Sequence, residues 1–158
     1  MIRRLLIAGI LVAAAGPLAL AQTAKKKEVT VESDQMEIFE SEKRAVFTGK
    51  VNARRDDARL TADRLVVLYE DVKQQDGTSK TEVAKLDATG NILIVTNTQK
   101  ITGQWAKMDV RANKLTVGGT VKVVQGQTIL TGETLNVDLD TNKTQMTGGR
   151  VKGSFVPQ

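Results

Sequence analysis

The sequence lacks the two side chains on which most catalytic and metal-binding sites depend. Among 158 residues there is no histidine and no cysteine. The chain therefore has no imidazole base, no thiolate nucleophile or metal ligand, and no disulfide. Its serines, Ser33, Ser41, Ser79 and Ser154, have no histidine to activate them, and its carboxylates lie at turns and outward positions. We expect no enzymatic activity, no cofactor and no metal.

Aromatic residues and proline are also scarce. Three Phe, one Tyr and one Trp supply few rings on which bases could stack, which argues against a single-strand nucleic-acid binder. The two prolines, Pro17 and Pro157, leave everything between them free to form a hydrogen-bonded ladder of strands. We therefore expect a β-sheet protein that does not bind nucleic acid.

The N-terminus has the composition of a secretory signal peptide. Arg3 and Arg4 precede an apolar run over 5–15, and Ala19-Leu20-Ala21 has the small-x-small form of a cleavage site. The run is shorter than the ~20 apolar residues that a spanning helix needs. We predict cleavage after Ala21, which lowers the formal charge from +5 to +3 by removing the two arginines. The predicted organisation is a signal peptide at 1–21, a flexible tail at 22–28 and one β-domain at 29–156.

Two short patterns recur along the chain, and their spacing indicates stacked repeats. A Gly-centred pattern is found at Gly90 and again 29 residues later at Gly119, then 30 residues later at Gly149, with an earlier copy at Gly49. A Thr-Gly/Ala pattern recurs at 60–63, 101–104 and 130–133. Repeats of two strands each bury their apolar face only by stacking on neighbours. The extra length lies in a polar insertion at 70–82, where Asp76-Gly77 predicts a protruding hairpin.

Alternation of apolar and polar residues predicts which side chains face inward. Period-two patterns are typical of strands with one buried face. Outward positions include Lys50, Asn91 and Lys122. Both parities are apolar in 65–68 and 92–95, so the register stays open there. The predicted inward set is Val31, Ile38, Val51, Leu65, Val67, Ile92, Ile94, Met108, Val121 and Leu135.

Two motif-like stretches carry no ligand signature. The run Asp138 to Asn142 resembles the start of a calcium loop, but Lys143 and Gly149 stand where Gly and Glu are required. The Gly-Gly pairs at 118–119 and 148–149 lack the Lys-Ser/Thr of a phosphate loop. We interpret the first as an Asp/Asn turn and the glycines as turn or bulge residues.

The repeated segments resemble the LptA/OstA family. The similarity rests on VESDQMEI at 31–38, AVFTGKV at 45–51, LTADRLVV at 60–67, ATGNI at 88–92, ITGQWAKMDV at 101–110 and LTGETLNVDL at 130–139. The resemblance implies an all-β fold, a twisted V-shaped β-jellyroll of stacked antiparallel strand repeats (OstA-like) with an apolar interior. It also implies a periplasmic protein of Gram-negative bacteria that carries lipopolysaccharide from the inner to the outer membrane.

Under this resemblance, the inward set becomes a candidate lipid-binding groove. The implied partners are lipopolysaccharide, the inner-membrane anchor subunit, the N-terminal domain of the outer-membrane barrel, and further copies of the chain stacked head to tail. The candidate edges for these contacts are Val29, Val31, Val151 and Phe155. Three alternatives stay open: a structural β-repeat protein of the envelope with a sealed core, an exported hydrolase, and a membrane-anchored relative that keeps its leader.

Overall fold

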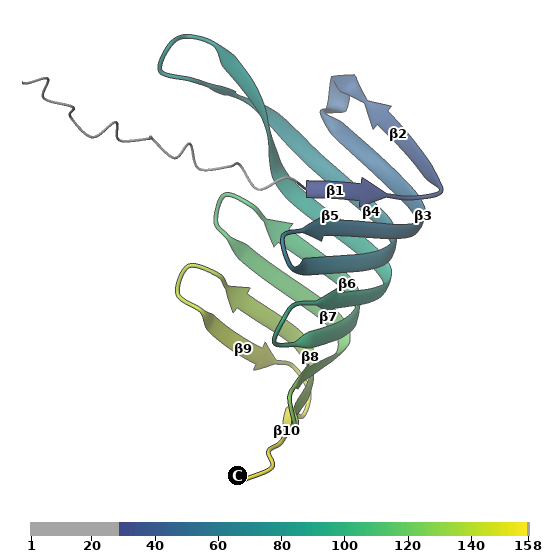
Figure 1. The fold of residues 1–158 in the computed structure, drawn as a ribbon, viewed down its shortest axis with the longest axis vertical. Coiled ribbons are helices and arrows are strands. Elements are labelled where there is room, and N and C mark those ends of the chain that lie inside the picture. Colours follow the sequence, from purple (N-terminus) through teal and green to yellow (C-terminus); the bar gives the residue numbers. More distant parts are fainter. Residues whose placement is uncertain (1–28, 158) are drawn as a thin grey trace, which may run out of the picture.

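The computed structural model describes residues 29–157, and these form ten β-strands and one short 3-10 helix (Figure 1). The predicted signal peptide at 1–21 and tail at 22–28 lie outside the described residues. The elements are β1 (Val29–Glu32), β2 (Gln35–Phe39), η1 (Glu40–Glu42), β3 (Arg44–Arg55), β4 (Ala58–Lys73), β5 (Ser79–Val95), β6 (Lys100–Asp109), β7 (Lys114–Gln125), β8 (Thr128–Asp138), β9 (Lys143–Thr147) and β10 (Lys152–Ser154).

All strands belong to one antiparallel sheet that follows the chain order. Its path is β1-β3-β4-β5-β6-β7-β8-β10, with β2 pairing beside β1 on β3 and β9 pairing beside β10 on β8. Consecutive strands from β2 to β9 join through hairpins, so each sequence repeat adds two strands to the sheet. Among the described residues, no helix is long and apolar enough to cross a membrane.

The sheet bends along one line, which divides it into two arms. The register shifts at the middle of each pairing from β3–β4 to β7–β8, between residues such as Thr48 and Val51. The first arm contains β2, β9 and residues 44–48, 64–73, 79–89, 105–109, 114–118 and 134–138. The second arm contains β1, β10 and residues 51–55, 58–62, 92–95, 100–103, 121–125 and 128–132.

The repeat glycines form the bend. Gly49 and Lys50 have φ values of 82° and 47°, and Gly119 and Thr120 have 79° and 58°, so two successive residues leave the β region. A bulge of this kind bends a strand and increases its twist. A Cβ atom at Gly119 would lie 2.6 Å from the Cβ of Gln104 on β6. Glycine is therefore required both by backbone conformation and by space, which explains the period read from the sequence.

The polar insertion forms the predicted hairpin. β4 and β5 continue to pair as far as Lys73 and Ser79, and the turn closes with a hydrogen bond from the Gln74 N–H to the Thr78 oxygen. In Figure 1 this hairpin extends beyond its neighbours. Ion pairs fix its base to the adjacent hairpins, because Lys43 contacts Asp71 and Arg111 Nη2 lies 2.8 Å from Glu70 Oε1.

Candidate functional site

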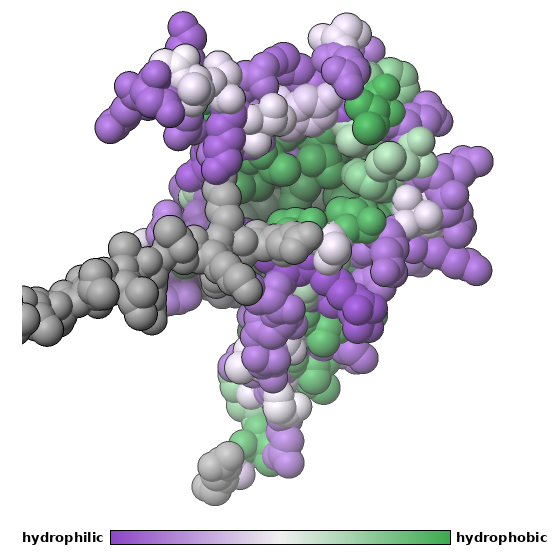
Figure 2. All heavy atoms as spheres, turned by 45° about the horizontal axis from the view of Figure 1, so that its top comes forward, coloured by the Kyte–Doolittle hydropathy of each residue, from purple (hydrophilic) through white to green (hydrophobic). Residues whose placement is uncertain are grey.

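Three unbroken rows of apolar residues line the space between the arms. Residues directly opposite each other in an antiparallel pair share a face, so each row runs across the sheet from strand to strand. The rows contain no charged side chain. Members of all three rows belong to a single hydrophobic cluster or pack against it, and this cluster contains residues of both arms. A space-filling view shows hydrophobic side chains gathered in a hollow with a hydrophilic rim (Figure 2).

Each row is defined by its register. The bend row of the first arm is Met36, Phe47, Leu65, Ala88, Ala106, Val117, Leu135 and Met146. The first mouth row is Ile38, Ala45, Val67, Leu86, Met108, Leu115 and Val137. The second mouth row, on the second arm, is Val31, Ala53, Leu60, Ile94, Ile101, Val123 and Leu130.

Residues beside the bend are packed core rather than an open lining. Leu65 is 0% exposed, and four other members of the predicted groove are equally enclosed, so a ligand cannot reach them without separating the arms. These four are Val51, Ile92, Val121 and Leu135. Both arms contribute to this cluster, which holds the V together by burial of apolar surface.

The rest of the predicted groove is accessible. Val31, Val67, Ile94 and Met108 lie in the mouth rows and are only partly buried. Ile38 occupies the first mouth row on the edge strand β2, where it is 54% exposed because no strand lies beyond it. The structure therefore divides the predicted set into five enclosed and five partly open residues. The second mouth row is itself partly enclosed, because Ala53, Ile101 and Val123 belong to the buried core. Parity alone could not make this division.

Exposed apolar residues gather at both ends of the sheet. At the β1–β2 end, Val29 is 47% and Met36 57% exposed, and at the β9–β10 end, Val151 is 45% and Phe155 68% exposed. The prediction of end strands named Val29, Val31, Val151 and Phe155, but it missed β2 and β9. Among residues 29–157, each end of the sheet has two unpaired strand edges, one on each arm. These edges belong to β1 and β2 at one end and to β9 and β10 at the other. β10 itself covers only Lys152–Ser154, so Val151 and Phe155 flank it.

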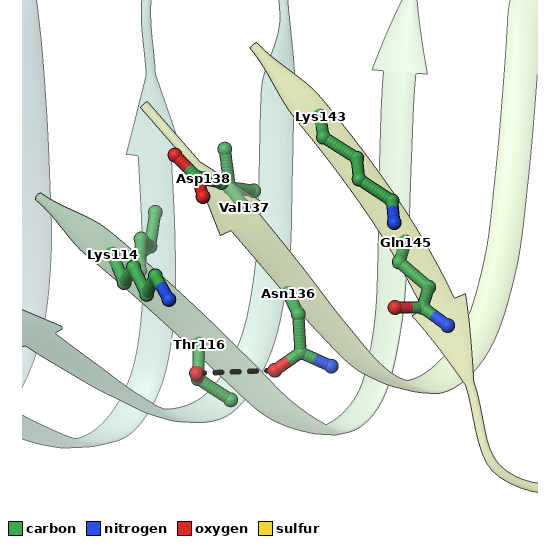
Figure 3. Close-up of a pocket in the computed structure, with 8 residues that line it drawn as sticks. Lys114, Thr116, Asn136, Val137, Asp138, Lys143 and Gln145 are labelled. Atoms are coloured by element: carbon green, nitrogen blue, oxygen red, sulfur yellow. Dashed lines mark hydrogen bonds between the residues drawn. The ribbon is translucent and has the colours of Figure 1, made fainter. Parts of the chain in front are cut away.

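Shallow depressions lie on the outer faces of both arms. One, of about 300 Å³, lies over β7, β8 and β9, where Lys114, Asp138, Lys143 and Gln145 surround a hydrogen bond from Thr116 to Asn136 (Figure 3). The Thr116 Oγ1 lies 3.2 Å from the Asn136 Oδ1. Because its lining is polar and open to solvent, this depression suits water better than an acyl chain.

Displaced carboxyl pKa values are found at hairpins and not between the arms. A hydrogen bond from Lys43 lowers the pKa of Asp71, and one from Thr78 lowers the pKa of Asp76. The backbone N–H of Thr141 lowers the pKa of Asp138 in the Asp/Asn turn predicted from sequence. Each shift is explained by a local turn contact at an exposed site, so none marks an acid or base poised for catalysis.

Comparison with known proteins agrees with this geometry. Residues 30–143, from β1 to the start of β9, match the family model described as LptA/(LptD N-terminal domain) LPS transport protein. The chain belongs to this family. An uncharacterized protein, R00383, of Rhizobium meliloti is 25% identical over 140 residues, which cover 87% of this chain and 75% of the relative.

A solved structure confirms the fold of this LptA-family chain. LptH of Pseudomonas aeruginosa, described as the LptA homologous periplasmic component of a lipopolysaccharide transport device, superposes with a TM-score of 0.69. The match covers 83% of this chain and 96% of LptH at 16% sequence identity. The predicted family and the all-β, V-shaped OstA-like jellyroll are both confirmed, and the family places the chain in lipopolysaccharide transport in general terms.

Proposed function

We propose that this protein carries lipopolysaccharide across the periplasm by holding its acyl chains between the two arms. The observation that supports this most strongly is the set of continuous apolar rows, which line the V from β2 at one end to β8 at the other. The protein acts as a non-enzymatic carrier, because a shielded apolar surface is sufficient for the task. Cleavage of the leader after Ala21 releases it into the periplasm.

The partly open members of the mouth rows provide the contact with lipid, while the enclosed residues act as a hinge core. Val67 and Met108 on the first arm and Ile94 on the second are partly buried, so an acyl chain reaches them from the mouth. Each methylene moved out of water contributes ~0.8 kcal/mol, so a chain of about 12 carbons contributes roughly 9 kcal/mol before ordering costs. Ile38 on β2 continues the apolar path to the end of the molecule.

The open ends support a bridge made of several copies. β1 and β2 pair only with β3, and β9 and β10 only with β8, so four strand edges are free among the described residues. Free edges add strands from another chain readily. A head-to-tail contact of this kind extends the apolar path of one copy into the next and also accepts the inner-membrane anchor and the N-terminal domain of the outer-membrane barrel.

Co-purification tests the carrier proposal. The mature protein, purified from a Gram-negative host without denaturant, is extracted with organic solvent, and the extract is analysed by mass spectrometry for the acyl chains of lipopolysaccharide. We expect these acyl chains in a ratio near one ligand to one protein. A protein that stays free of lipopolysaccharide, and gains none when incubated with it, would instead be the structural repeat protein left open by the sequence.

Light scattering across a concentration series tests the bridge. Because a head-to-tail contact does not close by symmetry, the mass should rise progressively with concentration. Removal of residues 150–158, which include β10 and Phe155, should leave a folded monomer. A constant monomer mass for the intact chain, or unchanged association after the truncation, would contradict end-to-end assembly.

A further inference from the structure

The outer face of the second arm carries a row of side chains without any acid. The row crosses eight strands, and adjacent members are register partners in every pairing. Its members alternate with the inward row that contains Ile94, so they point away from the interior. In order, the row is Thr30, Arg54, Arg59, Val95, Lys100, Val124, Ile129 and Ser154.

The neighbouring outer row adds two further basic residues, Lys122 and Lys152, and one acid, Glu32. Arg54 and Arg59 lie directly opposite each other, an arrangement that destabilises a sheet when no anion lies between the two charges. Two acids, Asp56 and Asp57, lie in the turn beyond the row, and Asp57 accepts a hydrogen bond from Asn97. The five basic side chains, Arg54, Arg59, Lys100, Lys122 and Lys152, are all exposed.

The charges on the outer face of the first arm alternate in sign. Its corresponding outer row contains Lys85, Asp109, Lys114, Asp138 and Lys143 as successive register partners, so positive and negative side chains alternate. Each aspartate in this ladder lies between two lysines, so most of the charge is offset across the strands. Because one fold carries both arrangements, the excess of positive charge belongs to one face and is not a general property of the surface.

Aliphatic side chains lie between the basic ones on the second arm. Val95 separates Arg59 from Lys100, and Val124 and Ile129 follow Lys100 in the same row. Ile129 is 37% exposed, and Val95 and Val124 are half-buried. Basic residues interleaved with exposed aliphatic ones are typical of surfaces that lie on anionic bilayers, where cations meet headgroups and apolar groups enter the interface.

We propose that the outer face of the second arm docks on a bilayer surface rich in anionic phospholipid headgroups. The charges are spread across the whole width of the sheet. Lys100 lines an open depression beside Leu93 and Thr102, but the other four basic residues lie outside it. A bilayer suits such a face, because it supplies a diffuse anionic layer and needs no shape complementarity. This docking would orient the carrier with its mouth rows directed away from the lipid-facing surface, and it does not depend on what the interior holds.

Vesicle flotation tests the proposal. The mature chain is mixed with vesicles of equal parts phosphatidylethanolamine and phosphatidylglycerol, or with vesicles of phosphatidylcholine alone. We expect binding to the anionic vesicles only, reversed by added salt. The triple variant Arg59→Gln, Lys100→Gln, Lys122→Gln should bind about 100-fold more weakly, because each basic residue near an anionic surface contributes about fivefold to affinity.

A matched variant distinguishes the effect of where the basic residues lie from the effect of the protein's net charge. Lys85→Gln, Lys114→Gln, Lys143→Gln removes the same charge from the first arm and should change vesicle affinity by less than about threefold. Equal losses in the two triples would overturn the proposal, as would failure of the parent chain to bind anionic vesicles. Circular dichroism verifies that each triple variant folds. If the second-arm triple does not fold, the single variant Lys100→Gln, at an exposed position, replaces it in the binding assay.

A site-specific probe reports which face touches the lipid. Because the chain has no cysteine, Ile129→Cys and Gln145→Cys each provide one position for an environment-sensitive fluorophore. The label at 129 should shift to the blue on anionic vesicles, and the label at 145, on the first arm, should not. Equal shifts would contradict the assignment. Lipopolysaccharide retained by both triples distinguishes membrane docking from ligand capture, whereas its loss from the second-arm triple would assign this face to ligand binding instead.

Discussion

Replacement of one bend glycine should destabilise the protein more than replacement of a turn glycine with the same backbone constraint. Gly119 and Gly126 both have positive φ, at 79° and 58°. A Cβ atom at Gly126 meets nothing within 4 Å, but one at Gly119 meets the Cβ and Cγ of Gln104 at 2.6 and 2.8 Å. The two substitutions to alanine therefore share the conformational cost and differ only in the steric one.

The magnitudes follow from these two terms. An alanine in the left-handed region costs about 1–2 kcal/mol, and an inserted carbon that forces its neighbours apart costs about 1–3 kcal/mol more. We expect a loss of about 1 kcal/mol of unfolding free energy for Gly126→Ala and about 3 kcal/mol for Gly119→Ala. Urea unfolding followed by circular dichroism measures both values, and the slope with denaturant verifies that the unfolded states are comparable.

A double-mutant cycle isolates the contact at the bend. Gln104→Gly removes the two carbons that the new methyl group would meet, so in this background Gly119→Ala should cost only its conformational term. We expect about 1–2 kcal/mol of the loss to be recovered. Equal destabilisation by the two alanine substitutions, or no coupling with Gln104, would refute the view that close packing across the bulge sets the bend.

Three further outcomes follow from the structure. Leu65→Ala should cost about 3 kcal/mol in urea unfolding because Leu65 is 0% exposed between the arms, whereas Leu68→Ala, on the outer face of the same strand, should cost less than about 1 kcal/mol. Asp71→Asn should slightly lower stability at neutral pH and have no effect in acid below the folded pKa. The hydrogen bond from Lys43 lowers the pKa of Asp71 in the folded protein. The ionised Asp71 side chain therefore stabilises the fold above the usual carboxyl pKa, and this stabilisation is lost as the pH falls through the folded pKa. Ile94→Asn should reduce the lipopolysaccharide recovered with the protein, measured by acyl-chain analysis, while Leu93→Asn, one residue away on the opposite face, should not.

Much of the fold could be predicted from local patterns. The spacing of Gly90, Gly119 and Gly149 indicated the number of repeats because a glycine recurs at the bend. The structure moves the last copy by one residue, since Gly148, with φ of 81°, takes the place of Gly119 and lies between β9 and β10. Alternation identified the inward parity of Val51, Val121 and Leu135. Where both parities are apolar the register was open, and the structure shows that Ile92 and Ile94 are the inward residues. The hairpin at 70–82 followed from Asp76-Gly77 and the polar residues around it.

The division of the interior could not be predicted in this way. Leu65 and Val67 share parity and chemistry, yet one is completely enclosed and the other is open toward the mouth. The difference arises from where each side chain lies between the folded arms, and distance to the bend is only part of it, because Ile101 and Val123 in the second mouth row are buried as well. If the repeated glycines had been interpreted as a bend within a strand, and not as a turn at its end, the sequence would have indicated which inward residues lie beside the bend. The charge asymmetry of the outer faces likewise depends on register across eight strands, since Arg54 and Lys100 are far apart in sequence.

Photo-crosslinking along one strand tests the central claim most directly. A photoreactive amino acid is placed in turn at Leu93, at Ile94 and at the enclosed Ile92, and cells are irradiated while lipopolysaccharide is in transit. We expect a lipopolysaccharide adduct at Ile94, in the mouth row, with little or none at Leu93 on the outer face or at Ile92 in the core. Adducts of equal yield at Ile94 and Leu93, or none at either, would contradict a carrier that holds its ligand between the arms.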